Sequence, residues 1–490
     1  MCGLIGYIGN RPAQPILIDC LRRLEYRGYD SCGLALLGDG IQVYKDQGKV
    51  AELQRGLSPN NERTGIGHTR WATHGGPSGI NAHPHLDCAG QIALVHNGIV
   101  TNFLRLRQQL TQEGHIFSSE TDTEVIVHLI EKYYRGDLAE AVATALGQIE
   151  GSYAIIALQT GPKKLVVARN ESPLLIGLGD GENFAASDAA AILDYTDRVV
   201  YLEDGDIGVI TDREITIANN GHEVSRQVQQ VPWTQEEAQK TGYEHFMLKE
   251  IHEQPRVIQN TLRGYLSAIE PVAPEIAANG DIAQILLLGC GTSYHAALVG
   301  KYLLEKLAKV AVRAELASEF NYHDTLLSKT WAIGITQSGE TADTLMALRK
   351  AKSLGCKTLV ITNVVGSSAT RIADEAFYIK AGPEISVAAT KSFIAQLVAF
   401  YLLALAWARI DTSSRERLMA ELRLLPNKVQ QLLDGQDDIA ELGEYLSRYD
   451  NAFFIGRGIN LPVALEGALK LKEISYIHAE GCAAGELKHG

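Results

Sequence analysis

The sequence predicts an α/β protein with a sheet-rich mixed domain first and a doubly wound parallel sheet after it. Two patterns predict this fold class. Short β-prone runs between Gly, Asn and Asp turns fill residues 1–215, whereas apolar strands, Gly/Ser turns and amphipathic helices alternate beyond residue 254. A chain of 490 residues corresponds to about three domains of ordinary size, and its 46% hydrophobic and 21% charged residues exclude intrinsic disorder.

The net charge and the cysteines narrow the function classes. Asp and Glu number 58 against 45 Lys and Arg, which gives a charge of −13 and argues against nucleic acid as the main partner. The seven cysteines form no CxxC pair, and no basic, apolar leader opens the chain. We therefore expect free thiols and a cytoplasmic location.

In the N-terminal half, β-prone runs lie at residues 92–95, 153–158, 164–168 and 199–202, and helical periodicity appears at residues 15–24 and 123–133. Residues 227–254 are polar and aperiodic, which predicts a linker. We expect one domain over residues 2–226, this linker, a second domain over 255–425 and the start of a third over 426–490.

In the C-terminal half, strands at residues 285–288 and 331–336 are each followed by a helix, at residues 296–307 and 342–354. The pattern restarts with a strand at 452–455 and a helix at 463–476, so Gly456-x-Gly458 repeats Gly289-x-Gly291 as a weak internal duplication. The apolar run 393–408 is shorter than the ~20 residues of a membrane span, so we expect a buried helix there.

Cys2 is the residue that points most directly to chemistry. A small residue after the initiator Met favours Met removal, which leaves a thiol and a free α-amine on one residue. That amine has a pKa of about 7.7–8.0 and can act as the base for its own thiol. A buried, inert cysteine is the alternative, and the rest of the domain decides between the two.

Five polar motifs accompany Cys2 in this half: Tyr26-Arg27-Gly28-Tyr29-Asp30-Ser31, His68-Thr69-Arg70-Trp71-Ala72-Thr73-His74-Gly75, Asn81-Ala82-His83-Pro84-His85, His96-Asn97-Gly98 and Glu120-Thr121-Asp122-Thr123-Glu124. Together they resemble the N-terminal-nucleophile glutamine amidotransferases, specifically the glutaminase domain of the glucosamine-6-phosphate synthase family. The resemblance runs across the whole chain. It implies an αββα glutaminase domain followed by sugar isomerase (SIS) domains with doubly wound parallel sheets, the second of them incomplete.

Hydrolysis of the glutamine amide needs residues of these types. The tetrahedral oxyanion needs fixed donors, which the side chain of Asn97 and the N–H of Gly98 could supply from a tight turn after the strand at 92–95. Arg70 offers a forked cation for the α-carboxylate, and Asp122 offers a carboxylate for the α-ammonium group. The resemblance implies the same roles. It also places around glutamine Arg27, Thr73, His74, His83 and, on a loop that gates ammonia, Trp71.

A zinc site is the competing interpretation of the histidines in this region. The residues that would carry it are His68, His74, His83, His85 and Cys88. Their spacings fit no standard zinc pattern, so we expect no metal, and nothing in the chain implies an organic cofactor.

The turn over residues 289–293 (Gly-Cys-Gly-Thr-Ser) lies between a strand and a helix, where backbone N–H groups and a helix N-terminus favour a phosphate. A dinucleotide is excluded because Tyr294 stands at the third glycine of G-x-G-x-x-G. No Walker lysine pattern is present for ATP. A second hydroxyl-rich turn, at residues 336–341, follows the next strand.

Both turns resemble those of sugar isomerase domains, which bind phosphosugars. Ala389 stands where that family commonly has Ser, so a side-chain contact at this position is lost. The resemblance implies a site for the sugar and its 6-phosphate made by Cys290, Gly291, Thr292, Ser293, Thr336, Gln337, Ser338, Thr341 and the backbone of Val387.

Lys470 and Glu473 share one face of a predicted helix, at positions i and i+3. Ketose-to-aldose isomerisation needs a base that carries a proton between C1 and C2 and an acid that opens the sugar ring. The resemblance implies Glu473 for proton transfer, His489 for ring opening and Lys470 in support. A solvated, charged helix face is the alternative interpretation.

The family closes its sugar site with a C-terminal tail that carries an imine-forming lysine, and the sequence ends at Gly490 before such a tail. The resemblance implies a homodimer that aminates and isomerises fructose 6-phosphate to glucosamine 6-phosphate at the expense of glutamine, with no membrane involved. Two alternatives stay open. One is a glutaminase that makes no amino sugar, and the other is a regulator that binds the phosphosugar without converting it.

Overall fold

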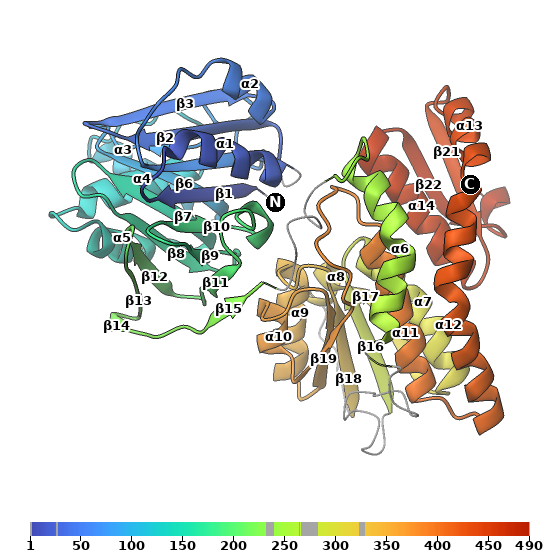
Figure 1. The fold of residues 1–490 in the computed structure, drawn as a ribbon. Helices are drawn as coiled ribbons and strands as arrows, with labels where there is room; N and C mark the ends of the chain where they lie inside the picture. Colours follow the sequence, from blue (N-terminus) through green and yellow to red (C-terminus); the bar gives the residue numbers. More distant parts are fainter. Residues whose placement is uncertain are drawn as a thin grey trace. The chain divides into compact units, whose positions relative to one another are not determined.

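The computed structural model describes residues 2–25, 28–231, 240–263, 265, 283–322 and 329–489. Its contacts divide the chain into two compact units, Met1–Ala238 and Gln239–Gly490 (Figure 1). Arg27 and residues 232–239 of the expected linker lie outside the described residues.

Two antiparallel sheets form the first unit. The eight-stranded sheet has the order β15 (Val228–Gln230), β11 (Arg198–Tyr201), β9 (Leu175–Leu178), β10 (Asn183–Ala186), β1 (Gly3–Ile8), β4 (Thr64–Arg70), β2 (Ser31–Leu37) and β3 (Ile41–Gln47). The seven-stranded sheet has the order β14 (His222–Glu223), β13 (Ile215–Asn219), β12 (Asp206–Ile210), β8 (Leu165–Asn170), β7 (Gly151–Gln159), β6 (Ile92–Val100) and β5 (His85–Leu86). Several neighbours, such as β7 and β8, are consecutive in the chain because short turns join antiparallel strands.

Helices cover the outer face of each sheet. On the eight-stranded sheet, one hydrophobic core includes α1 (Ala13–Leu24), α2 (Val50–Arg55) and η2 (Ala189–Ala191). On the seven-stranded sheet, another core includes α3 (Phe103–Gln112), α4 (Thr123–Tyr133) and α5 (Leu138–Leu146). A third core draws on strands of both sheets, with residues such as Leu4 and Ile156, and fills the space between them. These layers confirm the predicted αββα arrangement.

The structure differs from the sequence expectation at two places. β6 continues to Val100, so Asn97 and Gly98 lie inside the strand, opposite Ala154 and Tyr153 of β7, and not on a tight turn after residue 95. Part of the expected linker is also regular. Residues 228–230 form the edge strand β15, which is too short to be recognised from alternating polar and apolar residues. The helix α6 (Phe246–Arg263) begins before residue 254, the expected end of the linker.

A five-stranded parallel sheet is the centre of the second unit. Its order is β17 (Ala311–Leu316), β16 (Gln284–Gly289), β18 (Thr330–Ile335), β19 (Lys357–Thr362) and β20 (Glu375–Tyr378). One face packs on α6, α7 (Thr292–Leu307), α11 (Lys391–Ala406) and α12 (Thr412–Asp434). The other packs on α8 (Ala317–Phe320), α9 (Ala342–Ser353) and α10 (Ser368–Ile372). Helices on both faces confirm the predicted doubly wound sheet.

The last part of the chain starts a second strand–helix–strand unit. After α13 (Asp437–Leu446) come β21 (Asn451–Gly456), α14 (Asn460–Ser475) and β22 (His478–Ala483). The two strands pair in parallel, and α14 connects them. The short helix η5 (Leu487–His489) follows. The order β21 then α14 repeats the order β16 then α7, at the glycines that suggested the duplication.

The apolar run at 393–408 forms most of α11, which is buried along nearly its whole length and packs against α6 and α7. Within the described parts of the chain, no helix is both long and apolar enough to cross a membrane.

Candidate active site

Cys2 lies at the start of β1, next to the end of β4. Its Sγ accepts a hydrogen bond from the backbone N–H of Trp71 at 3.2 Å and lies 3.4 Å from the Trp71 carbonyl oxygen. The register explains this position, because β1 pairs Gly3 with Thr69 and leaves Cys2 beside the residues after β4. Burial raises the pKa of the Cys2 thiol, so the thiol stays protonated near neutral pH and needs a base to become a nucleophile.

Asn97 directs its side-chain amide at Cys2, since its Nδ2 donates to the Cys2 carbonyl oxygen at 2.8 Å. The next residue, Gly98, has a φ of +140°. A Cβ at this position would lie 2.1 Å from the carbonyl oxygen of Ser152. Only glycine therefore fits at this point of β6, directly after the amide that faces Cys2.

His68, on β4, holds the Asn97 amide in place. Its Nε2 lies 3.0 Å from Asn97 Oδ1 and 3.0 Å from the carbonyl oxygen of His96. A carbonyl oxygen only accepts hydrogen bonds, so Nε2 carries the proton and donates. Burial lowers the pKa of His68 to about 3, which keeps the ring neutral. Nothing in the motif around His68 indicates that it faces Asn97, so its place in the site could not be predicted from the sequence.

Arg70 and Asp122 are both buried, and both contact the loop that follows β4. The Arg70 guanidinium donates to the carbonyl oxygens of His74 and Gly75, at 3.0 Å in the case of Gly75. One oxygen of Asp122 accepts from the N–H of Val100 at 2.8 Å, and the other lies 3.9 Å from Nδ1 of His74. Both charged groups therefore face residues 71–76.

The same loop carries most of the other expected glutamine-binding residues. Trp71 is 41% exposed and meets the ring of Tyr29 edge-on, with centroids 5.6 Å apart. Thr73 is exposed, and His74 is half-buried. His83 is buried against His68, with ring centroids 4.2 Å apart.

In the second unit, the two expected phosphosugar turns leave the same edge of the parallel sheet. β16 and β18 are paired, with Gly289 opposite Ile335, so the residues after each strand are neighbours at the carboxyl edge. α7 begins at Thr292, earlier than the expected residue 296, and its first N–H groups face this edge. Cys290 and Gly291 form the turn before it. Ligands commonly bind at this edge of a doubly wound sheet.

The hydroxyl groups of these turns are fixed by hydrogen bonds. Thr336 Oγ1 accepts from the N–H of Gly339 at 3.2 Å and lies 3.0 Å from Thr341 Oγ1. Ser293 Oγ accepts from Nε2 of the buried Gln396 at 3.0 Å. The remaining expected members of the second turn are Gln337 and Ser338.

Glu466, which carries no expected role, links α14 to the start of α7. This buried carboxylate accepts from Thr292 Oγ1 at 2.9 Å and lies 2.7 Å from Nδ1 of His295. Its only sequence signal is the i,i+4 spacing to Lys470, which is common on solvated helices as well.

Lys470 and Glu473 form an ion pair beside the first phosphosugar turn. Nζ of Lys470 lies 2.5 Å from Glu473 Oε2 and donates to Thr292 Oγ1 at 2.9 Å. The structure thus brings Thr292, Lys470 and Glu473 into contact. His489 lies exposed in η5, near the end of the described chain.

Val387 is 51% exposed on a loop that a buried carboxylate of α6 holds in place. Glu250 accepts from the N–H groups of Ile385 at 2.6 Å and Ser386 at 3.0 Å. Burial, together with the charge of Glu384, raises the pKa of Glu250 to about 7. Sequence reasoning missed Glu250 because it lies in the stretch that was expected to be a linker.

The first unit is an αββα sandwich in which a cysteine at the start of a central strand faces an Asn-Gly pair, the architecture of a glutamine amidotransferase. The second unit is a parallel sheet with hydroxyl-rich turns at its carboxyl edge, the architecture of a sugar isomerase. Family models agree with both. The glutamine amidotransferase domain matches residues 68–194, and the SIS domain matches residues 281–406 and 445–490.

Relatives identify the family more closely. Proteins named glutamine–fructose-6-phosphate aminotransferase (isomerizing) are 51% identical over 504 residues in Thermococcus kodakarensis and 49% identical over 515 residues in Methanosarcina acetivorans. Each match covers 100% of this chain and 83% of the relative. This chain belongs to the family of isomerizing glutamine–fructose-6-phosphate aminotransferases.

A solved structure agrees for the second unit. The C-terminal domain of glucosamine-fructose-6-phosphate aminotransferase from Francisella tularensis is 42% identical, with a TM-score of 0.50, over 51% of this chain and 73% of that one.

Proposed function

We propose that this chain transfers the amide nitrogen of glutamine to fructose 6-phosphate and releases glutamate and glucosamine 6-phosphate. One observation carries the proposal. The amide of Asn97, whose orientation His68 fixes, donates to the backbone carbonyl oxygen of Cys2, the residue that carries the thiol. This arrangement suits attack on a carbonyl carbon, because a nucleophile and a preorganised donor for the resulting oxyanion lie together.

In the proposed glutaminase reaction, removal of Met1 frees the α-amine of Cys2, which takes the thiol proton. The sulfur attacks the side-chain carbonyl carbon of glutamine, and the negative oxygen of the tetrahedral intermediate accepts hydrogen bonds from Asn97 Nδ2 and the N–H of Gly98. Collapse breaks the C–N bond, and the departing nitrogen takes the proton from the α-amine to leave as ammonia. Water then hydrolyses the thioester to glutamate.

The proposed glutamine pocket lies over the loop after β4. Arg70 pairs with the α-carboxylate and Asp122 with the α-ammonium group, because each supplies the opposite charge from a buried position. In the structure Arg70 donates to loop carbonyls, so substrate binding requires it to exchange those bonds for the carboxylate. The other proposed contacts are Arg27, Trp71, Thr73, His74 and His83.

The proposed sugar site lies at the carboxyl edge of the parallel sheet. Glu473 moves the proton between C1 and C2, Lys470 holds that carboxylate by its ion pair, and His489 opens the ring. The start of α7 and the hydroxyls of the two turns bind the phosphate and the sugar. The proposed contacts are Cys290, Gly291, Thr292, Ser293, Thr336, Gln337, Ser338, Thr341 and the backbone of Val387.

We also propose a division into residues 2–226, 227–254, 255–425 and 426–490, a homodimeric assembly and a cytoplasmic location. The division into two units at residue 238 and the interruption of the SIS match between residues 406 and 445 support the first of these.

The test is to incubate the purified chain with glutamine and fructose 6-phosphate and to quantify both products. Near-equal amounts of glutamate and glucosamine 6-phosphate support the proposal, and Cys2→Ala must abolish both. Glutamate without amino sugar overturns the transfer step and leaves a glutaminase. The absence of both products overturns the whole proposal.

A further inference from the structure

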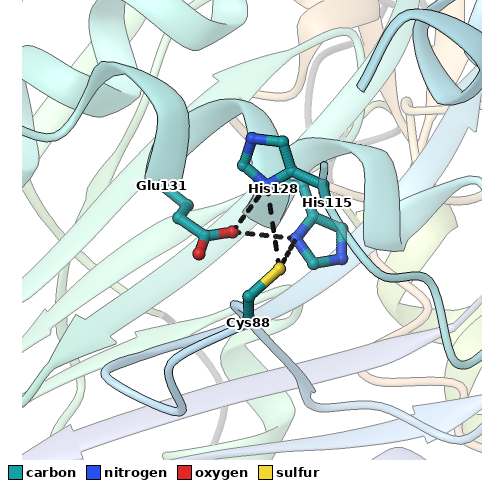
Figure 2. A group of neighbouring side chains, drawn as sticks. All are labelled: Cys88, His115, His128 and Glu131. Carbon is teal, nitrogen blue, oxygen red and sulfur yellow. Dashed lines mark hydrogen bonds and ion pairs between the residues drawn. The ribbon is translucent and has the colours of Figure 1, made fainter. Parts of the chain in front are cut away.

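Four potential metal ligands that the Cys2 site does not use converge in the first unit: Cys88, His115, His128 and Glu131 (Figure 2). Cys88 lies between β5 and β6, His115 lies between α3 and α4, and the other two lie on α4 at positions i and i+3. Their ligand atoms all lie within 4.8 Å of one another. We refer to these four residues as the Cys88 cluster.

We propose that the Cys88 cluster binds one zinc ion. Cys88 Sγ lies 3.8 Å from Nδ1 of His115 and 3.6 Å from Nδ1 of His128. Glu131 Oε2 lies 2.8 Å and 3.0 Å from the same two nitrogens. Around a tetrahedral zinc ion, sulfur and nitrogen are about 3.5 Å apart, and nitrogen and oxygen about 3.3 Å apart. The measured separations lie within about 0.5 Å of these values.

Hydrogen bonds account for the contacts of both nitrogens with Glu131, but a single thiol proton cannot account for both contacts with the sulfur. Each of the two Nδ1 atoms faces both the carboxylate of Glu131 and the sulfur of Cys88 (Figure 2). A nitrogen that donates to the carboxylate has no lone pair left for the thiol proton, and Cys88 has only one proton to give. A metal ion accepts lone pairs from all four atoms at once. A thiolate, two imidazoles and a carboxylate favour zinc over calcium or magnesium, which prefer oxygen ligands.

Neighbouring groups support the ligands as they do in known zinc sites. His128 is buried, and its second ring nitrogen, Nε2, lies 3.8 Å from Oε1 of Glu124. Glu124 is fixed by hydrogen bonds from the N–H groups of Ser118 and Ser119, both at 2.7 Å. The 3.8 Å separation between His128 and Glu124 is longer than a hydrogen bond, so Glu124 supports His128 by its charge behind the ring. The N–H of Ile116 donates to Cys88 Sγ at 3.5 Å, which stabilises a thiolate.

The Cys88 cluster is accessible from solvent, and a bound ion would stabilise the surrounding loops. Cys88 is exposed and lines a cavity of ≈ 440 Å³, through which an ion can enter. Four protein ligands are typical of a structural zinc site, in contrast to a catalytic site with an open position. The ion would join the loop after β5 and the loop before α4 to the helix itself. Cys88 lies far in sequence from His115, His128 and Glu131. The spacing between Cys88 and the histidines that precede it therefore did not predict a metal site.

The test is made on the full chain, purified without a polyhistidine tag and dialysed against metal-free buffer. Metal content is measured by mass spectrometry, and zinc affinity by competition with a chromophoric chelator. Cys88→Ser and His115→Asn remove ligands at exposed or partly exposed positions, so folding is preserved. Cys482→Ser and His222→Asn are matched controls that remove the same groups elsewhere.

We expect about one zinc per wild-type chain and per control, with affinity lowered about 100-fold or more in the two ligand variants. Cobalt should give a thiolate-to-metal charge-transfer band that Cys88→Ser abolishes and Cys482→Ser retains. Chelation should lower the melting temperature of the wild type and leave that of Cys88→Ser unchanged. Wild-type protein that folds but binds no zinc, or ligand variants that hold zinc as tightly as the controls, would overturn the proposal.

Discussion

Nε2 of His68 lies 3.0 Å from Oδ1 of Asn97, while Nδ2 of the same amide lies 2.8 Å from the carbonyl oxygen of Cys2. One end of the amide is therefore occupied by a neutral, buried imidazole, and the other end can only present its N–H groups to the nucleophile. These two hydrogen bonds fix the orientation of the Asn97 amide, the proposed oxyanion donor, before substrate binds.

Removal of the donor should impair chemistry more than binding. In Asn97→Ala, we expect glutaminase kcat to fall by about 10²–10³-fold with little change in the KM for glutamine, because the lost hydrogen bond is strongest in the tetrahedral intermediate. Steady-state glutamate release measures both constants. Asn220→Ala, at an exposed turn of the same unit, is the control. A kcat within threefold of wild type would show that Asn97 is not an oxyanion donor.

If His68 acts only through Asn97, the two substitutions should not add. His68→Leu should lower kcat by roughly tenfold on its own and have almost no effect in the Asn97→Ala background, which corresponds to a coupling on the order of 1 kcal/mol. A double-mutant cycle on kcat measures this coupling. Additive losses would mean that His68 contributes by another route, such as its contact with His83.

The ion pair on α14 should matter for sugar conversion alone. We expect Glu473→Gln to lower the rate of glucosamine 6-phosphate formation by about 10²–10⁴-fold, the usual contribution of a general base, and to leave glutamate release in place. Lys470→Met should also slow amino sugar formation, because it removes the partner 2.5 Å from Glu473. Lys472→Met, on the same helix but exposed, is the matched control. Equal losses of both products in Glu473→Gln would contradict the assignment.

Sequence patterns predicted the elements that have a clear period, and missed contacts between distant elements. The parallel strands and α11 are apolar over whole elements, so burial was visible without a structure. In β6, the apolar run ends at Val95 because His96, Asn97 and Gly98 follow it, although the strand continues to Val100. The Cys88 cluster depends on loops that only the fold brings together.

Glu250 gives a test that does not depend on catalysis. Its pKa in the folded chain is raised to about 7, whereas an unfolded glutamate titrates at its usual value of about 4.3. The folded state therefore holds a proton that the unfolded state has lost between these values. This contribution to stability is complete below the lower pKa and is lost as pH rises to about 7, by on the order of 3 kcal/mol.

Glu250→Gln removes this titration and keeps a side chain of the same shape. We expect the melting temperature of wild type, relative to Glu250→Gln, to fall as pH rises from about 5 to 8, because only the wild type loses a proton there. Calorimetry on the full chain measures the difference at each pH. A difference that is constant with pH, or that grows in favour of wild type, would show that the buried carboxyl is not held in its protonated form.

In the proposed reaction, attack of Cys2 on glutamine releases the nitrogen that the sugar receives. The most direct measurement supplies glutamine labelled with ¹⁵N in its side-chain amide, together with fructose 6-phosphate and excess unlabelled ammonium, and determines the ¹⁵N content of the glucosamine 6-phosphate by mass spectrometry. We expect labelled amino sugar from the wild-type chain and none from Cys2→Ala. Unlabelled glucosamine 6-phosphate from the wild-type chain, or none at all, would contradict it.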